Sequence, residues 1–359
     1  MSRTTIIAEA GVNHNGSLGV ALDMVEAAAK AGADVVKFQT FSAEAIVVRN
    51  AAKADYQKET TDSCETQLEM LKRYELSEHD HLAILKKCNE CGIEFLSTPF
   101  DIASVELLEK LELKRYKLSS GDITNWPLIH RIGMTGKPLI ISTGMSTLNE
   151  ISNALSIFAL GALKPEHVPE ESLMDEVDHS GLARKYLEGN MTLLHCTTQY
   201  PTPFEDVNLL AMDLLRETFR IPVGYSDHTE GILVSLCAVA KGAVMIEKHF
   251  TLDKSLPGPD HKASITPCEL ASLVQYAHSI EKLLGKKEKM VVKSERVNMD
   301  IARKSLVALC NIKKGDTFTT KNLGAKRPGT GISPAHMWSY IGCKATKNYS
   351  IDEQIEGLK

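Results

Sequence analysis

The sequence lacks any long apolar run. Its N-terminus, MSRTTIIAEAG, holds only a short apolar stretch before Glu9. A signal peptide or a membrane-spanning helix needs a longer one, so we expect a cytoplasmic protein without a membrane partner. A basic stripe interleaved with stacking aromatics is missing as well, which argues against nucleic-acid binding.

The sequence also lacks a cysteine framework. Eight cysteines are scattered along the chain, and only Cys88 and Cys91 form a CxxC pair. This pair is a weak redox or zinc signal. The alternative is two ordinary helical cysteines, because no second CxxC or histidine pair completes a zinc set. In a non-secreted chain of this size the cysteines are expected to be thiols.

Charge divides the chain into two parts. The 359 residues carry a net charge of −5, but from Arg303 to the end ten Lys or Arg stand against four Asp or Glu. Since domains rarely exceed about 250–300 residues, we expect a large acidic domain followed by a small basic one. The asymmetry fits chance variation of solvated surfaces. It equally fits a basic piece that docks on the acidic one or faces an anion.

Apolar, β-branched runs alternate with segments of helical spacing. The strand candidates are 5–9, 34–39, 93–98, 115–120, 138–143, 191–196, 221–226 and 244–250, and the helical segments include 19–33, 101–113, 147–160, 231–242 and 267–285. Eight strand–helix units in about 285 residues predict an α/β fold of the TIM (β/α)8 barrel type. A doubly wound sheet is the alternative, because the pattern alone does not prove closure.

Composition sets the expected domain boundaries. Residues 1–285 form the barrel, in which the acidic, proline-bearing segment 161–190 is interpreted as a surface insertion. Residues 286–302 are interpreted as a charged linker. Residues 303–359 contain short strand-like runs with turn signals and predict a small β-rich domain.

Polar side chains close every predicted strand, at the end where barrel enzymes build their sites. They include Glu9, Lys37, Gln39, Thr98, Lys117, Ser120, Ser142, His195, Ser226, His228, Glu247 and His249. Polar groups are costly inside a core unless they are paired, so eight such strand ends favour a functional site. Lys37 and Lys117 supply positive charge, and the serines supply compact donors. Together they suit phosphate and carboxylate oxygens.

The run VMIEKHF at 244–250 places Met245, Glu247 and His249 on one face of a strand. His228 follows the preceding strand, so in a closed barrel the two histidines are neighbours. Imidazoles with open positions beside them suit Mn²⁺, Fe²⁺, Co²⁺ or Zn²⁺. Glu247 would then orient a ligand or lie near the metal. A hydrogen-bonded pair of core histidines is the alternative.

Several longer motifs resemble the sialic acid synthase family. They are IAEAGVNHNG (7–16), VVKFQT (35–40), FLSTPFD (95–101), YKLSSGD (116–122), ISTGM (141–145), LLHCTTQYPTPFEDVNL (193–209), GYSDHT (224–229), EKHFTLD (247–253), PGPDH (257–261) and KRPGTGIS (326–333). The resemblance spans nearly the whole chain and is similar to the bacterial branch, which includes legionaminic acid synthases.

The resemblance implies an enzyme that condenses phosphoenolpyruvate with an N-acetylated amino sugar of the mannosamine type. The products would be a nine-carbon 2-keto acid, N-acetylneuraminate or N,N'-diacetyllegionaminate, and phosphate. It further implies a TIM barrel, a C-terminal SAF domain similar to type III antifreeze protein, and a domain-swapped homodimer.

The resemblance also implies roles for individual residues. Glu9, Lys37 and Lys117 would be catalytic, and His228 and His249 would hold Mn²⁺ or another divalent metal. The substrate-binding residues would be Gln39, Thr98, Ser120, Asp122, Ser142, Tyr200, Ser226, Asp260 and Arg327. Among all of these, Lys37 and Thr98 would face the phosphoenolpyruvate carboxylate; Lys117, Ser120, Ser142 and Ser226 its phosphate; and Glu9, Gln39, Tyr200 and Asp260 the sugar. Arg327 would reach the sugar's N-acyl group from the C-terminal domain, and whether it acts in cis or in trans stays open.

The sequence departs from relatives in two places, and the second leaves the sugar undetermined. Thr198 stands where some relatives have Asn, and the loop 56–67 differs in length and composition. N-acetylmannosamine and 2,4-diacetamido-2,4,6-trideoxymannose are both candidates. The alternatives are another phosphoenolpyruvate-dependent synthase, of pseudaminate type or acting on a phosphorylated aldose, and a non-catalytic binding protein.

Overall fold

The computed structural model describes residues 3–53, 65–170, 173 and 181–357. The chain divides into two compact units, Met1–Gly285 and Lys286–Lys359, and each is described here by itself. Among the described residues, no helix has the length and apolar character needed to cross a membrane.

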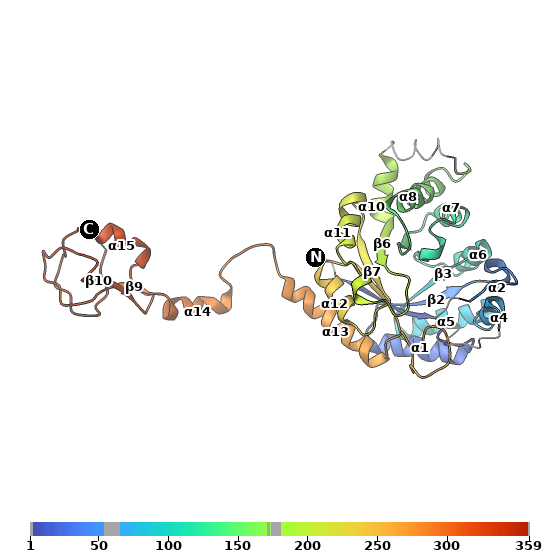
Figure 1. Cartoon of the computed structure of the whole chain (residues 1–359), viewed down its shortest axis with the longest axis horizontal. Coiled ribbons are helices and arrows are strands. Elements are labelled where there is room, and N and C mark those ends of the chain that lie inside the picture. Colours follow the sequence, from blue (N-terminus) through green and yellow to red (C-terminus); the bar gives the residue numbers. More distant parts are fainter. Residues whose placement is uncertain (1–2, 54–64, 171–172, 174–180, 358–359) are drawn as a thin grey trace. The chain divides into compact units, whose positions relative to one another are not determined.

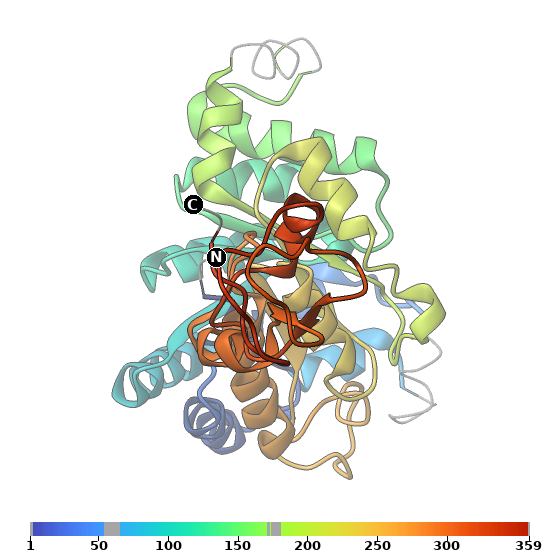
Figure 2. The same ribbon diagram turned by 90° about the vertical axis from the view of Figure 1, so that its left-hand side faces the viewer.

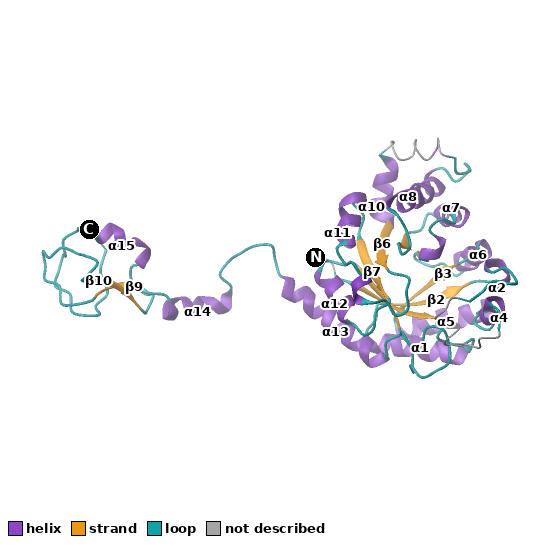
Figure 3. Ribbon diagram, viewed as in Figure 1, coloured by secondary structure: helices purple, strands orange, loops and turns teal. Residues whose placement is uncertain are grey.

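The first unit is built around eight parallel strands. They are β1 (Thr5–Gly11), β2 (Val35–Thr40), β3 (Glu94–Pro99), β4 (Tyr116–Leu118), β5 (Leu139–Ser142), β6 (Met191–Cys196), β7 (Val223–Asp227) and β8 (Met245–His249). The hydrogen-bonded order is β3-β2-β1-β8-β7-β6-β5-β4, and the two end strands also contact each other. The sheet therefore curls into a nearly closed barrel, as Figures 1 and 3 show. The barrel prediction is confirmed, and the doubly wound alternative is wrong.

Helices surround the strands. They are α1 (Leu18–Ala31), α2 (Ala43–Ile46), α4 (Gln67–Lys72), α5 (Glu78–Cys91), α6 (Ile102–Lys110), α7 (Trp126–Met134), α8 (Leu148–Leu163), α10 (Leu182–Asn190), α11 (Ala211–Phe219), α12 (Leu233–Ala240) and α13 (Pro267–Leu284), with short 3-10 turns η1 (Ser120–Asp122) and η2 (Phe204–Asp206). Helices α7 and α8 pack side by side, as the green ribbons of Figures 1 and 2 show. All five helical segments predicted from the sequence are present, with ends shifted by a few residues.

The segment 161–190 is more regular than the predicted insertion. Helix α8 continues to Leu163, and α10 occupies Leu182–Asn190. Ala183 and Leu187 are buried against the barrel core, so an apolar stripe ties α10 to the body of the unit. The sequence interpretation relied on the acidic and proline residues that precede this helix, and it therefore missed the helix's apolar stripe. Residues 171–172 and 174–180 lie outside the described part of the chain.

The barrel strands use their two faces differently. Ile7, Val35, Leu96, Ile140 and Leu194 fill the barrel interior together with Met245. The outward faces pack against the helices in a larger core. Strand β8 follows the predicted alternation, because Met245 points inward while Ile246 and Phe250 belong to the outer core. The next inward positions along β8 are Glu247 and His249.

The second unit is small. It contains helix α14 (Lys293–Ala302), an antiparallel pair of strands β9 (Ser305–Ala308) and β10 (Leu323–Lys326), the 3-10 turn η3 (Pro334–His336) and helix α15 (Met337–Tyr340). Its core includes Leu306, Phe318, Tyr340 and Tyr349. Helix α14 falls inside the segment interpreted as a linker, because charged residues such as Lys and Glu are also good helix formers.

The cysteines agree with the expected thiols. All seven that fall among the described residues are free, while Cys64 lies outside them. Cys88 and Cys91 occupy the last turn of α5, and Cys88 is buried. Across the described residues no group of three or more His, Cys, Asp or Glu is placed to hold a metal. The CxxC pair therefore consists of two free cysteines at the end of a helix.

Candidate active site

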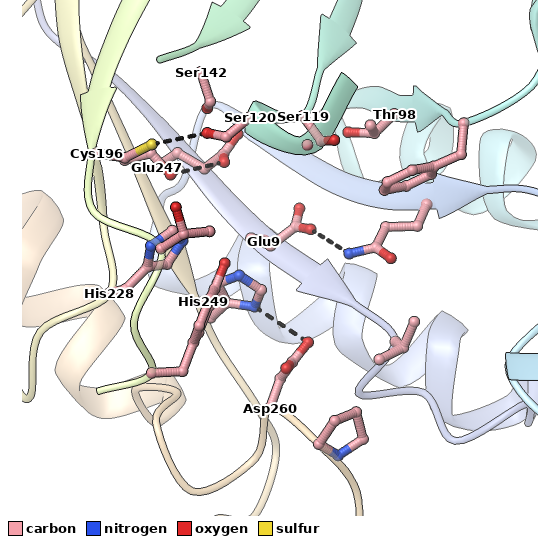
Figure 4. A pocket seen from close by; sticks show the side chains of 18 of the residues that line it. Glu9, Thr98, Ser119, Ser120, Ser142, Cys196, His228, Glu247, His249 and Asp260 are labelled. Carbon is pink, nitrogen blue, oxygen red and sulfur yellow. Dashed lines mark hydrogen bonds and ion pairs between the residues drawn. The ribbon is translucent and has the colours of Figure 1, made fainter. Parts of the chain in front are cut away.

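A cavity of about 490 Å³ opens at the carboxyl ends of the barrel strands. Of the fourteen residues to which the family resemblance assigns a role, twelve line it: Glu9, Lys37, Gln39, Thr98, Lys117, Ser120, Ser142, Tyr200, Ser226, His228, His249 and Asp260. Figure 4 shows many of their side chains converging from different strands. This convergence follows from the topology, since the carboxyl ends of parallel strands meet at one rim.

The other two residues with an implied role are Asp122, which is not among the lining residues, and Arg327. The Asp122 carboxylate accepts hydrogen bonds from Ser119 Oγ at 2.7 Å and Asn125 Nδ2 at 3.2 Å. It therefore holds Ser119, which does line the cavity. Arg327 belongs to the second unit, where its Nε donates to the Ala302 carbonyl oxygen at 3.1 Å.

Two ammonium groups and two carboxylates share the cavity floor. Lys37 Nζ lies 2.7 Å from Glu9 Oε2 and 3.6 Å from Glu247 Oε2. Lys117 Nζ lies 3.3 Å from Glu247 Oε1, to which Ser226 Oγ donates at 3.0 Å. All four charged side chains are at most 5% exposed. Their charges cancel as a set, so an anion entering the cavity meets no net positive charge from them.

Burial and charge move the pKa values of these groups in different directions. Burial raises the pKa of Glu9, and Lys37 offsets this only in part. Burial alone would also raise the pKa of Glu247, but Lys117 and Lys37 together lower it to about 2. Burial lowers the pKa of Lys117 against the attraction of Glu247. Of the two carboxylates, Glu9 is thus the one closer to taking up a proton.

An irregularity in β1 positions Glu9. The register between β1 and β2 shifts between Glu9 and Gly11, and Gly11 has a φ of 52°. A Cβ at Gly11 would lie 3.2 Å from Glu9 Oε1 and 3.5 Å from His249 Cε1. Glycine therefore provides both the left-handed backbone and the space that this part of the cavity needs. Gln39 Nε2 donates to Glu9 Oε1 at 3.3 Å and fixes the carboxylate from the other side.

Small hydroxyl donors gather beside Lys117. Ser142 Oγ and Thr198 Oγ1 are buried and have no hydrogen-bond partner among the described residues. Ser120 Oγ accepts from the Gly144 amide at 3.0 Å, and a Cβ at Gly144 would come within 2.8 Å of Thr198 Oγ1. Unpaired buried hydroxyls are unfavourable, so their presence indicates a place for a polar ligand. Hydroxyls near an ammonium suit the oxygens of a phosphate.

His228 and His249 face each other across the rim. Their ring centroids are 5.5 Å apart, and the ring of Tyr200 lies 4.2 Å from that of His228. Burial lowers the pKa of His228 to about 4 and that of His249 well below its usual value. Both imidazoles are therefore neutral at ordinary pH, the form that binds metals.

The tautomer of His228 also fits a metal ligand. Its Nδ1 lies 2.7 Å from the Thr197 carbonyl oxygen, which can only accept, so Nδ1 carries the proton and Nε2 keeps its lone pair. His249 Nδ1 is buried without a hydrogen-bond partner among the described residues and lies 3.8 Å from Asp260 Oδ2. Two neutral imidazoles with these free positions suit a divalent cation whose remaining ligands are water and substrate.

The contacts of Glu247 and the cavity wall formed by helix α4 were not predicted from the sequence. Glu247, expected to serve the histidines or the metal, also contacts Lys117, Lys37 and Ser226. Helix α4 also contributes a wall, formed by Gln67, Met70 and Leu71. Its start carries a capping box in which Thr66 and Glu69 bond each other's backbone amides, a signal visible in the sequence as T-x-x-E. Residues 56–64 of the variable loop lie outside the described part of the chain.

Comparisons with known proteins show which family the chain resembles. A sequence profile described as the NeuB family matches residues 24–289. The chain is 48% identical over 355 residues to the N,N'-diacetyllegionaminic acid synthase of Campylobacter jejuni, covering 99% of each chain. It is 46% identical to the enzyme of the same name from Legionella pneumophila, covering 96% of this chain and 91% of that one.

A solved structure shares the fold. The N-acetylneuraminic acid (sialic acid) synthetase of Leptospira borgpetersenii superposes with a TM-score of 0.67 at 32% identity. The match covers 83% of this chain and 90% of the other. The similarity therefore extends over the barrel and over most of both sequences.

Proposed function

The chain belongs to the NeuB family, and on that basis we propose that it is a phosphoenolpyruvate-dependent nonulosonic acid synthase. It condenses phosphoenolpyruvate and water with an N-acetylated amino sugar, giving a nine-carbon 2-keto acid and phosphate. The observation that carries the proposal is near full-length identity of 48% to an N,N'-diacetyllegionaminic acid synthase, combined with the cavity of paired lysines and histidines. N,N'-diacetyllegionaminate is accordingly the favoured product.

We propose that phosphoenolpyruvate occupies the half of the cavity around the two lysines. Lys117 would hold the phosphate together with Ser120, Ser142, Thr198 and Ser226, where two hydroxyls otherwise have no partner. Lys37 and Thr98 would face the carboxylate, and Lys37 Nζ already donates to Thr98 Oγ1 at 3.1 Å. An ammonium 4 Å from an anion contributes about 4 kcal/mol at an effective dielectric of about 20.

The sugar would lie over Glu9 and Gln39, with its carbonyl toward Tyr200, Asp260 and the histidines. Carbon 3 of phosphoenolpyruvate attacks that carbonyl carbon, water adds at carbon 2, and phosphate leaves by C–O cleavage. Glu9 would transfer a proton or stabilise positive charge at carbon 2, and its position between the two halves of the cavity supports this role. Its raised pKa suits proton transfer.

We propose that His228 and His249 bind Mn²⁺ or a similar divalent ion. When bound, such an ion supplies Lewis-acid polarisation of the sugar carbonyl. Its positive charge would also balance the negative charge of the substrate. The two lysines do not provide this balance, because Glu9 and Glu247 already neutralise them. The proposal rests on the neutral imidazoles and on the tautomer of His228.

We further propose that the second unit is a SAF domain and that the protein is a domain-swapped homodimer. Arg327 would reach the sugar's N-acyl group in the barrel of the other copy. The net positive charge from Arg303 onward supports an approach to a more acidic partner surface. A cytoplasmic location is proposed because all seven described cysteines are free thiols.

Phosphate release tests the proposed function. The purified protein is mixed with Mn²⁺, phosphoenolpyruvate and either N-acetylmannosamine or 2,4-diacetamido-2,4,6-trideoxymannose. We expect release that requires a sugar and is faster with the diacetamido sugar. No release with either sugar would refute the synthase proposal. A non-catalytic protein is disfavoured because Glu9 and both histidines line one cavity.

A further inference from the structure

A second cavity of about 420 Å³ adjoins the first. The two share the lining residues Gln39, Gln67, Leu71, Phe100, Ser119 and Gly121. Six further residues line only the second cavity: Phe41, Ala45, Ile46, Val47, Asp122 and Asn125. We call it the side cavity. Because so much of its wall is shared, it is continuous with the candidate active site.

The side cavity has an apolar wall. Phe41 and Phe100 meet edge to face with ring centroids 6.1 Å apart, and Ile46 and Leu71 pack against the same cluster. Such surfaces favour methyl and other apolar groups over water. Helices α2 and α4 supply much of this wall.

Contacts between the helices hold that wall in place. Lys72 Nζ of α4 lies 2.6 Å from Glu44 Oε1 of α2. Just beyond α4, Glu75 Oε1 accepts from the Ala43 amide at 2.5 Å. The second contact is partly buried and binds the first residue of α2, so it ties α2 to the segment that follows α4.

The polar groups of the side cavity suit amides and not phosphates. Gln39 and Gln67 present amide groups at the opening shared with the first cavity. Among the described residues, no Lys or Arg lines the side cavity, while the Asp122 carboxyl does. A phosphate would find no cation there, and an acylamino group would find both hydrogen-bonding and apolar partners.

The side cavity lies away from the histidine pair. Figure 4 shows Glu9 between His249 and Ser119, and Ser119 borders both cavities. An extended sugar with its carbonyl near the histidines would thus pass over Glu9 and Gln39 toward the side cavity. We propose that the side cavity binds the end of the sugar remote from the carbonyl, selecting acylamino and deoxy substituents and excluding a phosphate.

This inference rests on the proposed function and deepens it. The test is Ile46→Trp, which fills the side cavity without changing any residue that lines the first. We expect KM for 2,4-diacetamido-2,4,6-trideoxymannose to rise at least about tenfold, as steric loss of an apolar subsite predicts. KM for the smaller N-acetylmannosamine should change much less, and KM for phosphoenolpyruvate should stay the same. Ala45→Trp, at an exposed position of the same wall, should act in the same direction.

Val48→Trp is the matched control, since Val48 is 76% exposed and lines neither cavity. It should leave all three KM values unchanged. A second arm compares N-acetylmannosamine with its 6-phosphate in the wild-type protein, where we expect at least about tenfold poorer use of the phosphate. Equal losses for both sugars in the tryptophan variants, or no loss, would overturn the inference, as would equal use of the phosphorylated sugar. Failure of the proposed function would appear separately, as no phosphate release by the wild-type protein.

Discussion

Lys248 and Asp227 form an ion pair in which both side chains are fully buried, with Nζ 3.1 Å from Oδ2. The pair lies behind the cavity, because each residue is the chain neighbour of one of the two histidines. Asp227 also accepts from the backbone amide and hydroxyl of Thr229 and from Ser235 Oγ, and Lys248 Nζ donates to the Thr229 carbonyl oxygen. This hydrogen-bonded network connects the ends of β7 and β8, from which the histidines project.

The first prediction concerns this ion pair. Lys248→Met should lower the free energy of unfolding by about 3–5 kcal/mol, because it leaves the Asp227 carboxylate buried without its cation. Lys254→Met, which breaks the partly exposed pair with Glu269, is the matched control and should cost less than about 1 kcal/mol. Urea denaturation measures both. Equal costs for the two variants would contradict the structural role of the buried pair.

The second prediction concerns the metal. His228→Ala should weaken Mn²⁺ binding by more than about 100-fold, since it removes one of two imidazole ligands. Electron paramagnetic resonance titration measures the free ion without requiring turnover. His195→Ala is the control, because His195 also sits near a strand end but its Nε2 lies 2.8 Å from the Val207 carbonyl oxygen. Unchanged Mn²⁺ affinity in His228→Ala would refute the histidine site.

The third prediction couples the metal to phosphoenolpyruvate. The charges of Lys37, Lys117, Glu9 and Glu247 cancel, so a buried anion needs a further cation. Removing the metal with a chelator should weaken phosphoenolpyruvate binding by about 5–150-fold, the usual range of coupling between sites. Phosphoenolpyruvate should strengthen Mn²⁺ binding by the same factor. Calorimetric titrations in which the two affinities are independent would disprove the charge argument.

The fourth prediction separates binding from chemistry at Glu9. Glu9→Gln keeps the side-chain shape and removes the charge that pairs with Lys37. Phosphoenolpyruvate affinity should be retained or increased, because Lys37 is released for the substrate. The turnover number should fall by about 10²–10⁴-fold if Glu9 transfers a proton. Weaker phosphoenolpyruvate binding with unchanged turnover would argue for a purely structural carboxylate.

The fifth prediction is a loss of stability in acid. Burial lowers the pKa of His14 and His228 to about 4 each, against 6.5 for an unperturbed histidine. As pH falls from 6.5 toward 4, the unfolded chain takes up these protons and the folded chain does not. Each histidine should therefore remove at most about 3 kcal/mol of stability in that window, and none of this loss should occur above it.

Protonation of Asp260 should stabilise the folded state in acid, whereas protonation of the histidines favours the unfolded chain. Asp260 therefore provides a check on the fifth prediction. Burial raises its pKa to about 7, so the folded state binds this proton first as pH falls from 7 toward 3.8. Asp260→Asn should therefore make the loss of stability in acid steeper. Denaturation can be followed in a Trp338→Phe background, which leaves Trp126 as the only tryptophan and reports on the barrel. Constant stability of the Asp260→Asn variant between pH 7 and pH 4 would contradict the histidine assignment, and equal pH dependence of the two proteins would contradict the Asp260 assignment.

Strand-level features of the protein could be predicted from the sequence because they depend on local periodicity. The alternation in VMIEKHF placed Glu247 and His249 on one face and Lys248 on the other, as observed. Polar residues at strand ends located the cavity, since parallel strands bring their carboxyl ends to one rim. Long motifs then pointed to the family.

Only the tertiary structure decided which of these groups are partners. The ion pair of Lys117 with Glu247 joins β4 and β8, which are far apart in the sequence, and its geometry depends on barrel closure. Lys37 meets Glu9 across the neighbouring strands β1 and β2, and only the sheet register brings these two residues opposite each other. The side cavity and the wall from α4 likewise required coordinates, because no local pattern relates Phe41 to Leu71 or Phe100. Local sequence sets which face a side chain takes, while distances between side chains on different strands follow from the packing of the whole barrel.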